Sequence, residues 1–195
     1  MTPQPPPGTE GLLSGDWYFD TAELRALRVA AGRLLDEFNA LPAEALAERE
    51  ALLHSLFGSC GASVEVVPRF RCSYGFNITV GRNVYVNADA FLMDDGPITL
   101  GDDVRIGPGA VLATALHPID DHGLRRAGAE RTAPIVIGDN CWLGSNVTVG
   151  AGVAIGRNTV VGAGSVVVRD LPDHVVAVGS PAKVIRHLPL EEAPA

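Results

Sequence analysis

The sequence predicts a mainly β protein: a parallel β-helix of six-residue repeats, closed by an N-terminal helical hairpin. Three observations predict this fold class. An aliphatic residue followed by glycine recurs every six residues, small or turn-forming residues fill the intervening positions, and two amphipathic segments precede the repeat. Each unit supplies a short strand and a tight turn, so stacked coils bury their aliphatic side chains in one continuous core.

The beginning of the chain is predicted to be a flexible tail, residues 1–14. Four prolines fall within the first ten residues, and no apolar pattern accompanies them. We therefore expect ordered structure to begin near Gly15.

Residues 15–58 are predicted to form the helical hairpin. In the first helix, Asp20 is the expected N-cap and Glu23 completes a variant of the capping box. The apolar residues at helical spacing are Leu24, Leu27, Ala31, Leu34, Leu35 and Phe38. A second helix follows Pro42 and ends at Gly58. Its predicted buried residues are Leu46, Leu53, Leu56 and Phe57.

Residues 59–180 carry the repeat. The aliphatic-glycine pairs of its longest run are Ile137-Gly138, Leu143-Gly144, Val149-Gly150, Ile155-Gly156 and Val161-Gly162. Leu112 is the last inward-facing residue before this run, so residues 113–133 are predicted to leave the coil as an extruded loop. The final segment, 181–195, is predicted to contain a short helix that begins at Pro181 and covers the open end of the coil.

Composition limits the possible partners. The 195 residues fit one domain, and a formal net charge of -8 offers no positive field to bind a nucleic acid. We expect no membrane span and no secretory signal, hence a cytoplasmic location. The three widely spaced cysteines, Cys60, Cys72 and Cys141, are expected to be reduced thiols.

Several segments resemble a known family, the maltose and galactoside O-acetyltransferases within the hexapeptide-repeat acyltransferases. These segments are WYFDTAELRALR, FRCSYGFNITVG, NVYVNADAFLMDD, HPID, IGDNCWLGSNVTV, VGAGSVV and VGSPAKVIR. The resemblance implies a left-handed β-helix that assembles as a homotrimer. It also implies acetyl-CoA as co-substrate, no required metal, and acetyl transfer to a sugar hydroxyl at sites between subunits.

The resemblance also implies roles for individual residues. The histidine of HPID, His117, is the implied general base, and Asn87 is the implied partner that holds its imidazole or the acceptor hydroxyl. The implied acceptor-binding residues are Asp20, Ser73, Asp95 and Glu130. The implied cofactor-binding residues are Trp142, Gly144, Ser145, Ala163, Gly164, Arg169, Lys183 and Arg186.

Histidine suits the chemistry, because its unperturbed pKa of about 6.5 lets it take a proton from an alcohol and return it to a thiolate. Each position also has a structural interpretation. Asn87 and the small residues are typical of β-helix corners, Asp20 of a helix cap, and Lys183 and Arg186 of a solvated surface. Glu130, within AGAERTAP, favours the maltose branch.

Two positions depart from the family pattern. Val168 and Arg169 stand where many relatives have Thr-Lys, so a hydroxyl contact to the cofactor is lost and the cation changes type. Leu116 precedes His117 where a small or polar residue is usual, and we expect it to narrow the acceptor pocket or to make the pocket more apolar.

Two other functions remain open at this point. A γ-carbonic-anhydrase-like metal enzyme shares this fold, and His117 and His122 have its histidine spacing. Such a site takes three histidines, and the other histidines, His54, His174 and His187, lie in the helical hairpin or beyond the last repeat. A catalytically silent trimeric scaffold is the second alternative; the intact histidine, asparagine and tryptophan set argues against it.

Overall fold

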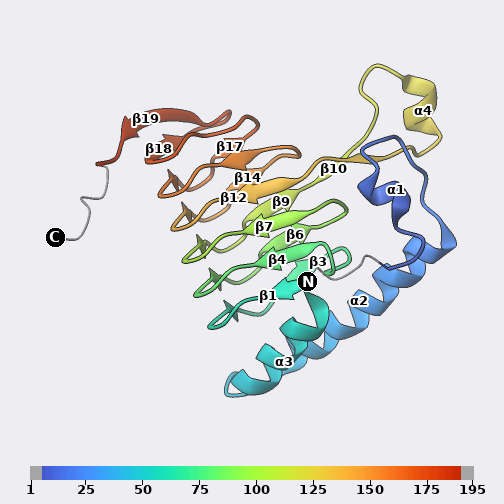
Figure 1. Cartoon of the computed structure of the whole chain (residues 1–195), viewed down its shortest axis with the longest axis horizontal. Helices are drawn as coiled ribbons and strands as arrows, with labels where there is room; N and C mark the ends of the chain where they lie inside the picture. The colour runs from blue at the N-terminus through green and yellow to red at the C-terminus, as the bar shows by residue number, and fades with distance from the viewer. Residues whose placement is uncertain (1–5, 190–195) are drawn as a thin grey trace.

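The computed structural model describes residues 6–189 and shows a parallel β-helix with three faces (Figure 1). Face 1 consists of β1 (Ser59–Cys60), β4 (Ile78–Val80), β7 (Ile98–Leu100), β12 (Ile135–Ile137) and β15 (Ala154–Ile155). Face 2 consists of β2 (Glu65–Val66), β5 (Tyr85–Val86), β8 (Arg105–Ile106), β13 (Trp142–Leu143), β16 (Val160–Val161), β18 (Val175–Val178) and β19 (Lys183–His187). Face 3 consists of β3 (Arg71–Cys72), β6 (Phe91–Met93), β9 (Val111–Ala113), β14 (Thr148–Val149) and β17 (Val166–Val167). The predicted fold class is confirmed.

The core of the β-helix is a set of aliphatic ladders. On face 1, Leu100 and Ile137 pair in register, Ile137 pairs with Ile155, and all three side chains are buried. Faces 2 and 3 repeat the arrangement with Ile106 over Leu143 and Leu112 over Val149. The six-residue period therefore places one apolar side chain at the same inward position in every coil.

The corner between faces 1 and 2 is built from residues with a positive φ. These residues are Ser63, Asn83, Asp103, Asn140, Asn158 and His174. Asn and Asp tolerate the left-handed conformation better than other non-glycine residues, which explains their recurrence in the repeat. The Asn140 amide donates to Asn158 Oδ1 at 2.8 Å, so the corner side chains also bond from coil to coil.

The N-terminal region contains α1 (Glu10–Leu13), α2 (Ala22–Ala40) and α3 (Leu46–Leu56). Figure 1 shows α3 against β1, at the end of the stack where the coils begin. Phe38 and Phe57 pack edge-on against Phe70, with ring centroids 6.4 and 5.8 Å away. These aromatic contacts attach the helical hairpin to the first coil.

Two predictions for the beginning of the chain are wrong. Ordered structure starts before Gly15, because α1 lies within the predicted tail and Leu12 is fully buried against Tyr18 and Leu24. Residues 1–5 lie outside the described residues. The N-cap of α2 is Thr21, whose hydroxyl accepts from the Leu24 N–H, and not Asp20.

Two further predictions are also wrong. Leu46, expected to be buried, is 65% exposed because it borders an open hollow between the start of α3 and β2. The segment expected to form a C-terminal helix is instead strand β19, which pairs antiparallel with β18. The pairing covers the edge of the last strand of face 2, and the β-branched Val184 and Ile185 favour a strand. Residues 190–195 lie outside the described residues.

Between β9 and β12 the chain leaves the coil. β10 (Ala115–Leu116) pairs antiparallel with β11 (Arg131–Thr132), and α4 (His122–Arg126) lies between them. None of the helices within residues 6–189 is both long and apolar enough to cross a membrane.

The aliphatic ladder predicts that alanine substitutions at two adjacent positions of β12 lower the free energy of unfolding by very different amounts. Ile137→Ala should lower the free energy of unfolding by about 2–5 kcal/mol, because it leaves a cavity within the ladder. Val136→Ala, at an outward and exposed position, should cost less than about 1 kcal/mol. Urea denaturation at a fixed protein concentration measures both; equal losses would contradict the inward and outward assignment.

Candidate active site

The candidate base, His117, follows β10 on the extruded loop. Its Nδ1 lies 3.0 Å from the carbonyl oxygen of Ala129, and its side chain is otherwise exposed. A carbonyl oxygen only accepts hydrogen bonds, so this contact requires the proton on Nδ1 and leaves the lone pair on Nε2. The neutral imidazole therefore presents a proton acceptor to the solvent side of the loop.

The loop around His117 is held by its own polar side chains. Asp121 caps α4 by accepting from the Leu124 N–H at 2.8 Å. Arg125 donates to the carbonyl oxygens of Pro118 and Ile119, at 2.8 and 2.6 Å. These bonds fix the two residues directly after His117, so the imidazole is attached to a constrained backbone.

Two adjacent aspartates, Asp94 and Asp95, lie after β6. Asp94 holds the turn formed by residues 73–77 through hydrogen bonds. Asp94 is fully buried and accepts the backbone N–H groups of Ser73, Tyr74 and Asn77, at 2.9, 2.8 and 3.3 Å. Burial raises the pKa of the Asp94 carboxyl to about 7. Three backbone donors to one carboxylate indicate a structural role for Asp94.

Asp95 and Ser73 form a direct pair. The Ser73 hydroxyl donates to Asp95 Oδ2 at 3.0 Å, and Asp95 is largely buried. Burial raises the pKa of the Asp95 carboxyl, and the nearby negative charge of Glu130 raises it further. Glu130 in turn accepts from the Tyr18 hydroxyl at 3.0 Å.

Asp20 joins this group through an arginine. Arg28 donates two hydrogen bonds to the Asp20 carboxylate, both at 2.8 Å, and one to the Tyr74 hydroxyl. The Arg28 hydrogen bonds hold the pKa of Asp20 below its ordinary value. Tyr74 directly follows Ser73, so the ion pair between Asp20 and Arg28 lies beside the Ser73–Asp95 pair.

The structure thus brings together four of the predicted residues. They are Asp20, Ser73, Asp95 and Glu130, and we call them the carboxylate cluster. Sequence reasoning missed Tyr18 and Arg28. Tyr18 is separated from Glu130 by 112 positions, so no local pattern in a single sequence relates the two.

Asn87 lies elsewhere on the β-helix. It follows β5 at the corner between faces 2 and 3, and its Oδ1 accepts from the Ala88 N–H at 2.8 Å. Met93 pairs with Ala113 across β6 and β9, so the loop leaves from the opposite edge of face 3. Within one chain, Asn87 and His117 are therefore separated by the width of face 3.

The small residues of the predicted cofactor groove share the Asn87 corner. Gly164 donates its N–H to the Ser145 carbonyl oxygen at 2.8 Å, which places one coil of this corner directly on the next. A Cβ on Gly144 would lie 2.7 Å from the Ala163 nitrogen, so glycine is required there by packing alone. Gly164 has a φ of 70° and nothing within 4 Å of an added Cβ, so the flank there is open.

The remaining predicted cofactor residues are exposed. Trp142 on β13 is 56% exposed and pairs with Arg105 and Val160 in the neighbouring coils. Arg169 follows β17, and the antiparallel strand β19 carries Lys183 and Arg186. Ala182 donates its N–H to the Val166 carbonyl oxygen, so the start of β19 lies close to β17 and the open corner.

The described part of the chain offers no ligand set for the metal alternative. Within residues 6–189, no three His, Cys, Asp or Glu side chains converge in a way that could hold a metal ion. The spacing of His117 and His122 is therefore not accompanied by a third ligand in the described part of the protein.

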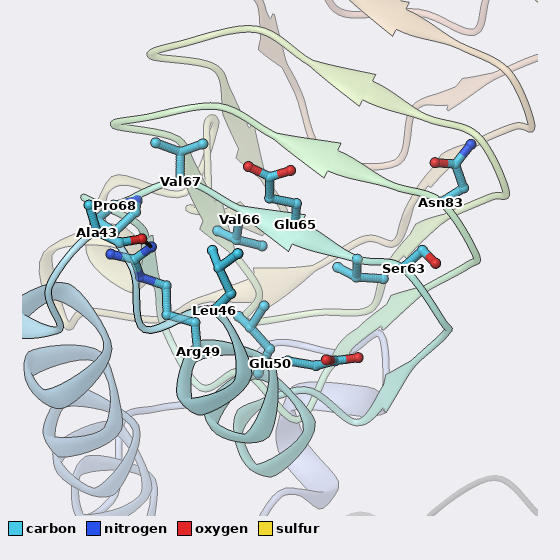
Figure 2. Close-up of a pocket in the computed structure, with 12 residues that line it drawn as sticks. Ala43, Leu46, Arg49, Glu50, Ser63, Glu65, Val66, Val67, Pro68 and Asn83 are labelled. Carbon is cyan, nitrogen blue, oxygen red and sulfur yellow. Dashed lines mark hydrogen bonds between the residues drawn. The ribbon is translucent and has the colours of Figure 1, made fainter.

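A separate hollow of about 490 Å³ lies between α3 and β2 (Figure 2). Leu46, Arg49, Glu50, Glu65 and Pro68 contribute to its lining. None of the predicted catalytic, acceptor or cofactor residues is among the residues that line it.

Comparisons with known proteins identify the family of this chain. Residues 12–61 match the maltose acetyltransferase hexapeptide capping motif, and residues 134–169 match the bacterial transferase hexapeptide model of six repeats. Galactoside O-acetyltransferase of Escherichia coli (strain K12) is 40% identical over 183 residues, which cover 93% of this chain and 90% of that protein. The chain belongs to the maltose and galactoside acetyltransferase family.

Solved structures support the same relationship. A maltose O-acetyltransferase from Clostridium difficile 630 superposes with a TM-score of 0.91 and 40% identity, covering 93% of this chain and 97% of that one. A hexapeptide-repeat acetyltransferase from Vibrio cholerae O1 biovar eltor was solved in complex with acetyl coenzyme A. It superposes with a TM-score of 0.84 and 41% identity, covering 92% of this chain and 97% of that one. This acetyltransferase thus shares both the coil and the helical cap of its relatives.

The buried Asp94 predicts a distinct pH dependence. Its pKa is raised above the ordinary value of 3.8, so the folded protein binds more protons than the unfolded chain between pH 4 and 7. Relative to Asp94→Asn, the wild type should gain stability as the pH falls through this range, by at most about 1.4 kcal/mol per pH unit. Urea midpoints of both proteins from pH 5 to pH 8 measure this difference. A difference that does not change with pH would show that Asp94 is ionised throughout.

Proposed function

We propose that this protein transfers the acetyl group of acetyl-CoA to a sugar hydroxyl, with His117 as general base. The observation that carries the proposal is the Nδ1 contact of His117 to the Ala129 carbonyl, which leaves Nε2 free to accept a proton. Nε2 takes the proton of the acceptor hydroxyl while its oxygen attacks the thioester carbonyl. The tetrahedral intermediate collapses as the protonated imidazole returns the proton to the leaving thiolate.

The carboxylate cluster is the proposed acceptor site. Carboxylate oxygens accept hydrogen bonds from sugar hydroxyls, and Asp20, Asp95 and Glu130 supply three such groups on one side of the loop base. Leu116 narrows the approach, and Glu130 favours a maltose or glucose-like acceptor over a galactoside.

The Asn87 corner is the proposed acetyl-CoA site. Its open flank at Ala163 and Gly164, with Gly144, Ser145 and Trp142 below, suits the narrow pantetheine arm. Arg169, Lys183 and Arg186 lie toward the C-terminal end and would meet the phosphates. Use of acetyl-CoA fits the predicted cytoplasmic location.

We further propose that three chains assemble as a trimer and that each chain contacts its neighbours along its own face 3. The acceptor half of the site lies at one edge of this face and the cofactor half at the other, so one chain alone does not join them. A head-to-tail contact that brings unlike edges together closes into a ring of identical interfaces, each holding one complete site. The outward side chains of face 3 include Phe91, Met93, Val111 and Val166, which suit a buried contact.

Two variants of the loop test the base. With acetyl-CoA and a panel of sugars, release of free thiol should fall about 10²- to 10⁴-fold in His117→Ala, with the trimer intact by light scattering. His122→Ala is the matched control on the same loop and should retain activity. Undiminished turnover in His117→Ala would contradict the assignment.

The same assay separates the alternatives. Absence of acetyl transfer in the wild type, together with stoichiometric zinc in the purified protein, would favour the metal enzyme. Absence of acetyl transfer with every acceptor and without bound zinc would favour the silent scaffold.

A further inference from the structure

The segment that precedes α2 contacts the catalytic loop directly. Tyr18 and Glu130 form an isolated antiparallel bridge, in which Tyr18 N–H donates to the Glu130 carbonyl at 2.8 Å and Glu130 N–H donates to the Tyr18 carbonyl at 2.9 Å. The Thr132 hydroxyl donates to the Leu12 carbonyl oxygen at 2.6 Å. Figure 1 shows α1 beside the loop that carries α4.

This contact adds a third strand to a short hairpin. β10 and β11 pair over only two positions, Ala115 with Thr132 and Leu116 with Arg131. An isolated two-stranded hairpin is marginally stable in water. Tyr18 extends the pairing on the side of the return strand, residues 130–132, that faces away from β10. The Tyr18 ring is buried with Leu12 and Leu24. The return strand is thereby anchored to the helical cap.

The anchored strand carries the carbonyl group that orients the histidine. Ala129 directly precedes Glu130, is fully buried, and accepts the His117 Nδ1–H. A shift of the return strand would move this carbonyl, and the tautomer of a histidine is set by the hydrogen bond that its other nitrogen makes.

We propose that Tyr18 is a positioning residue for His117: its backbone bridge to Glu130 holds the Ala129 carbonyl in place and so keeps the lone pair on Nε2. The inference rests on the proposed function, because the lone pair on Nε2 matters only if His117 is the base. It assigns to the N-terminal cap, beyond closing the coil, a part in the geometry of the site.

The test compares Tyr18→Pro with Tyr18→Phe. Proline removes the N–H that donates to Glu130, whereas phenylalanine keeps the backbone bridge and the ring and removes only the hydroxyl bond to the Glu130 side chain. In Tyr18→Pro, kcat should fall about 10- to 100-fold with the KM for acetyl-CoA unchanged. In Tyr18→Phe, the KM for the acceptor should rise while kcat is largely retained.

A spectroscopic measurement supplies the second readout. In ¹⁵N-histidine-labelled protein, His117, assigned by its absence in His117→Ala, should show the Nδ1–H tautomer in the wild type and in Tyr18→Phe. Tyr18→Pro should shift it toward Nε2–H. This readout needs no turnover, so failure of the proposed acetyl transfer would leave the positioning test valid.

A folded Tyr18→Pro with an unchanged tautomer and unchanged kcat would overturn the proposal. If Tyr18→Pro does not fold, Thr132→Val tests the same anchor, because it removes only the hydroxyl that donates to Leu12. It should move the tautomer and kcat in the same direction, by a smaller amount. An unchanged tautomer in Thr132→Val would then overturn the proposal.

Discussion

Backbone hydrogen bonds between successive coils determine where the candidate functional residues on the β-helix corners lie. Each coil repeats the register of the one before, so residues far apart in sequence share one corner. Asn87, Ser145 and Gly164 reach the same corner because the strands before them, β5, β13 and β16, stack in register with β8 on face 2. The cofactor half of the proposed site is therefore a consequence of the same ladder that buries the aliphatic core.

The candidate base His117 lies where that ladder is interrupted. After β9 the chain leaves the coil, and the excursion must satisfy its own backbone groups before it rejoins at β12. It does so with the β10–β11 pair, the capped helix α4, and the Tyr18 bridge. The catalytic candidate thus lies on a segment that coil stacking does not support, and contacts from Leu12 and Tyr18 help to hold that segment.

Much of the fold could be predicted from the sequence, because a six-residue period leaves few ways to bury its aliphatic side chains. Corner residues such as Asn140 and Asn158 could also be predicted, since their conformation is local. The errors have a common cause. The burial of Leu12 and Leu46 and the strand conformation of Lys183–His187 depend on contacts with distant parts of the chain. A single sequence does not show which distant parts come into contact.

The candidate site shows the same division. The resemblance pointed to Asp20, Ser73, Asp95 and Glu130, and the structure gathers them in one cluster. It did not indicate that Arg28 and Tyr18 hold this cluster, because both act through contacts between distant segments. The separation of His117 from Asn87 within one chain likewise could not be predicted from the sequence, because it follows from the register of face 3.

The central claim is that an active site is completed between two chains. Mixed trimers of His117→Ala and Asn87→Ala chains test it most directly, with each variant also assembled alone as a control. Neither variant alone should be active, whereas each mixed trimer should regain one of its three interfaces with an intact His117 and an intact Asn87, about a third of wild-type activity. Mixed trimers as inactive as the parents would show that both residues must come from the same chain and would contradict the account.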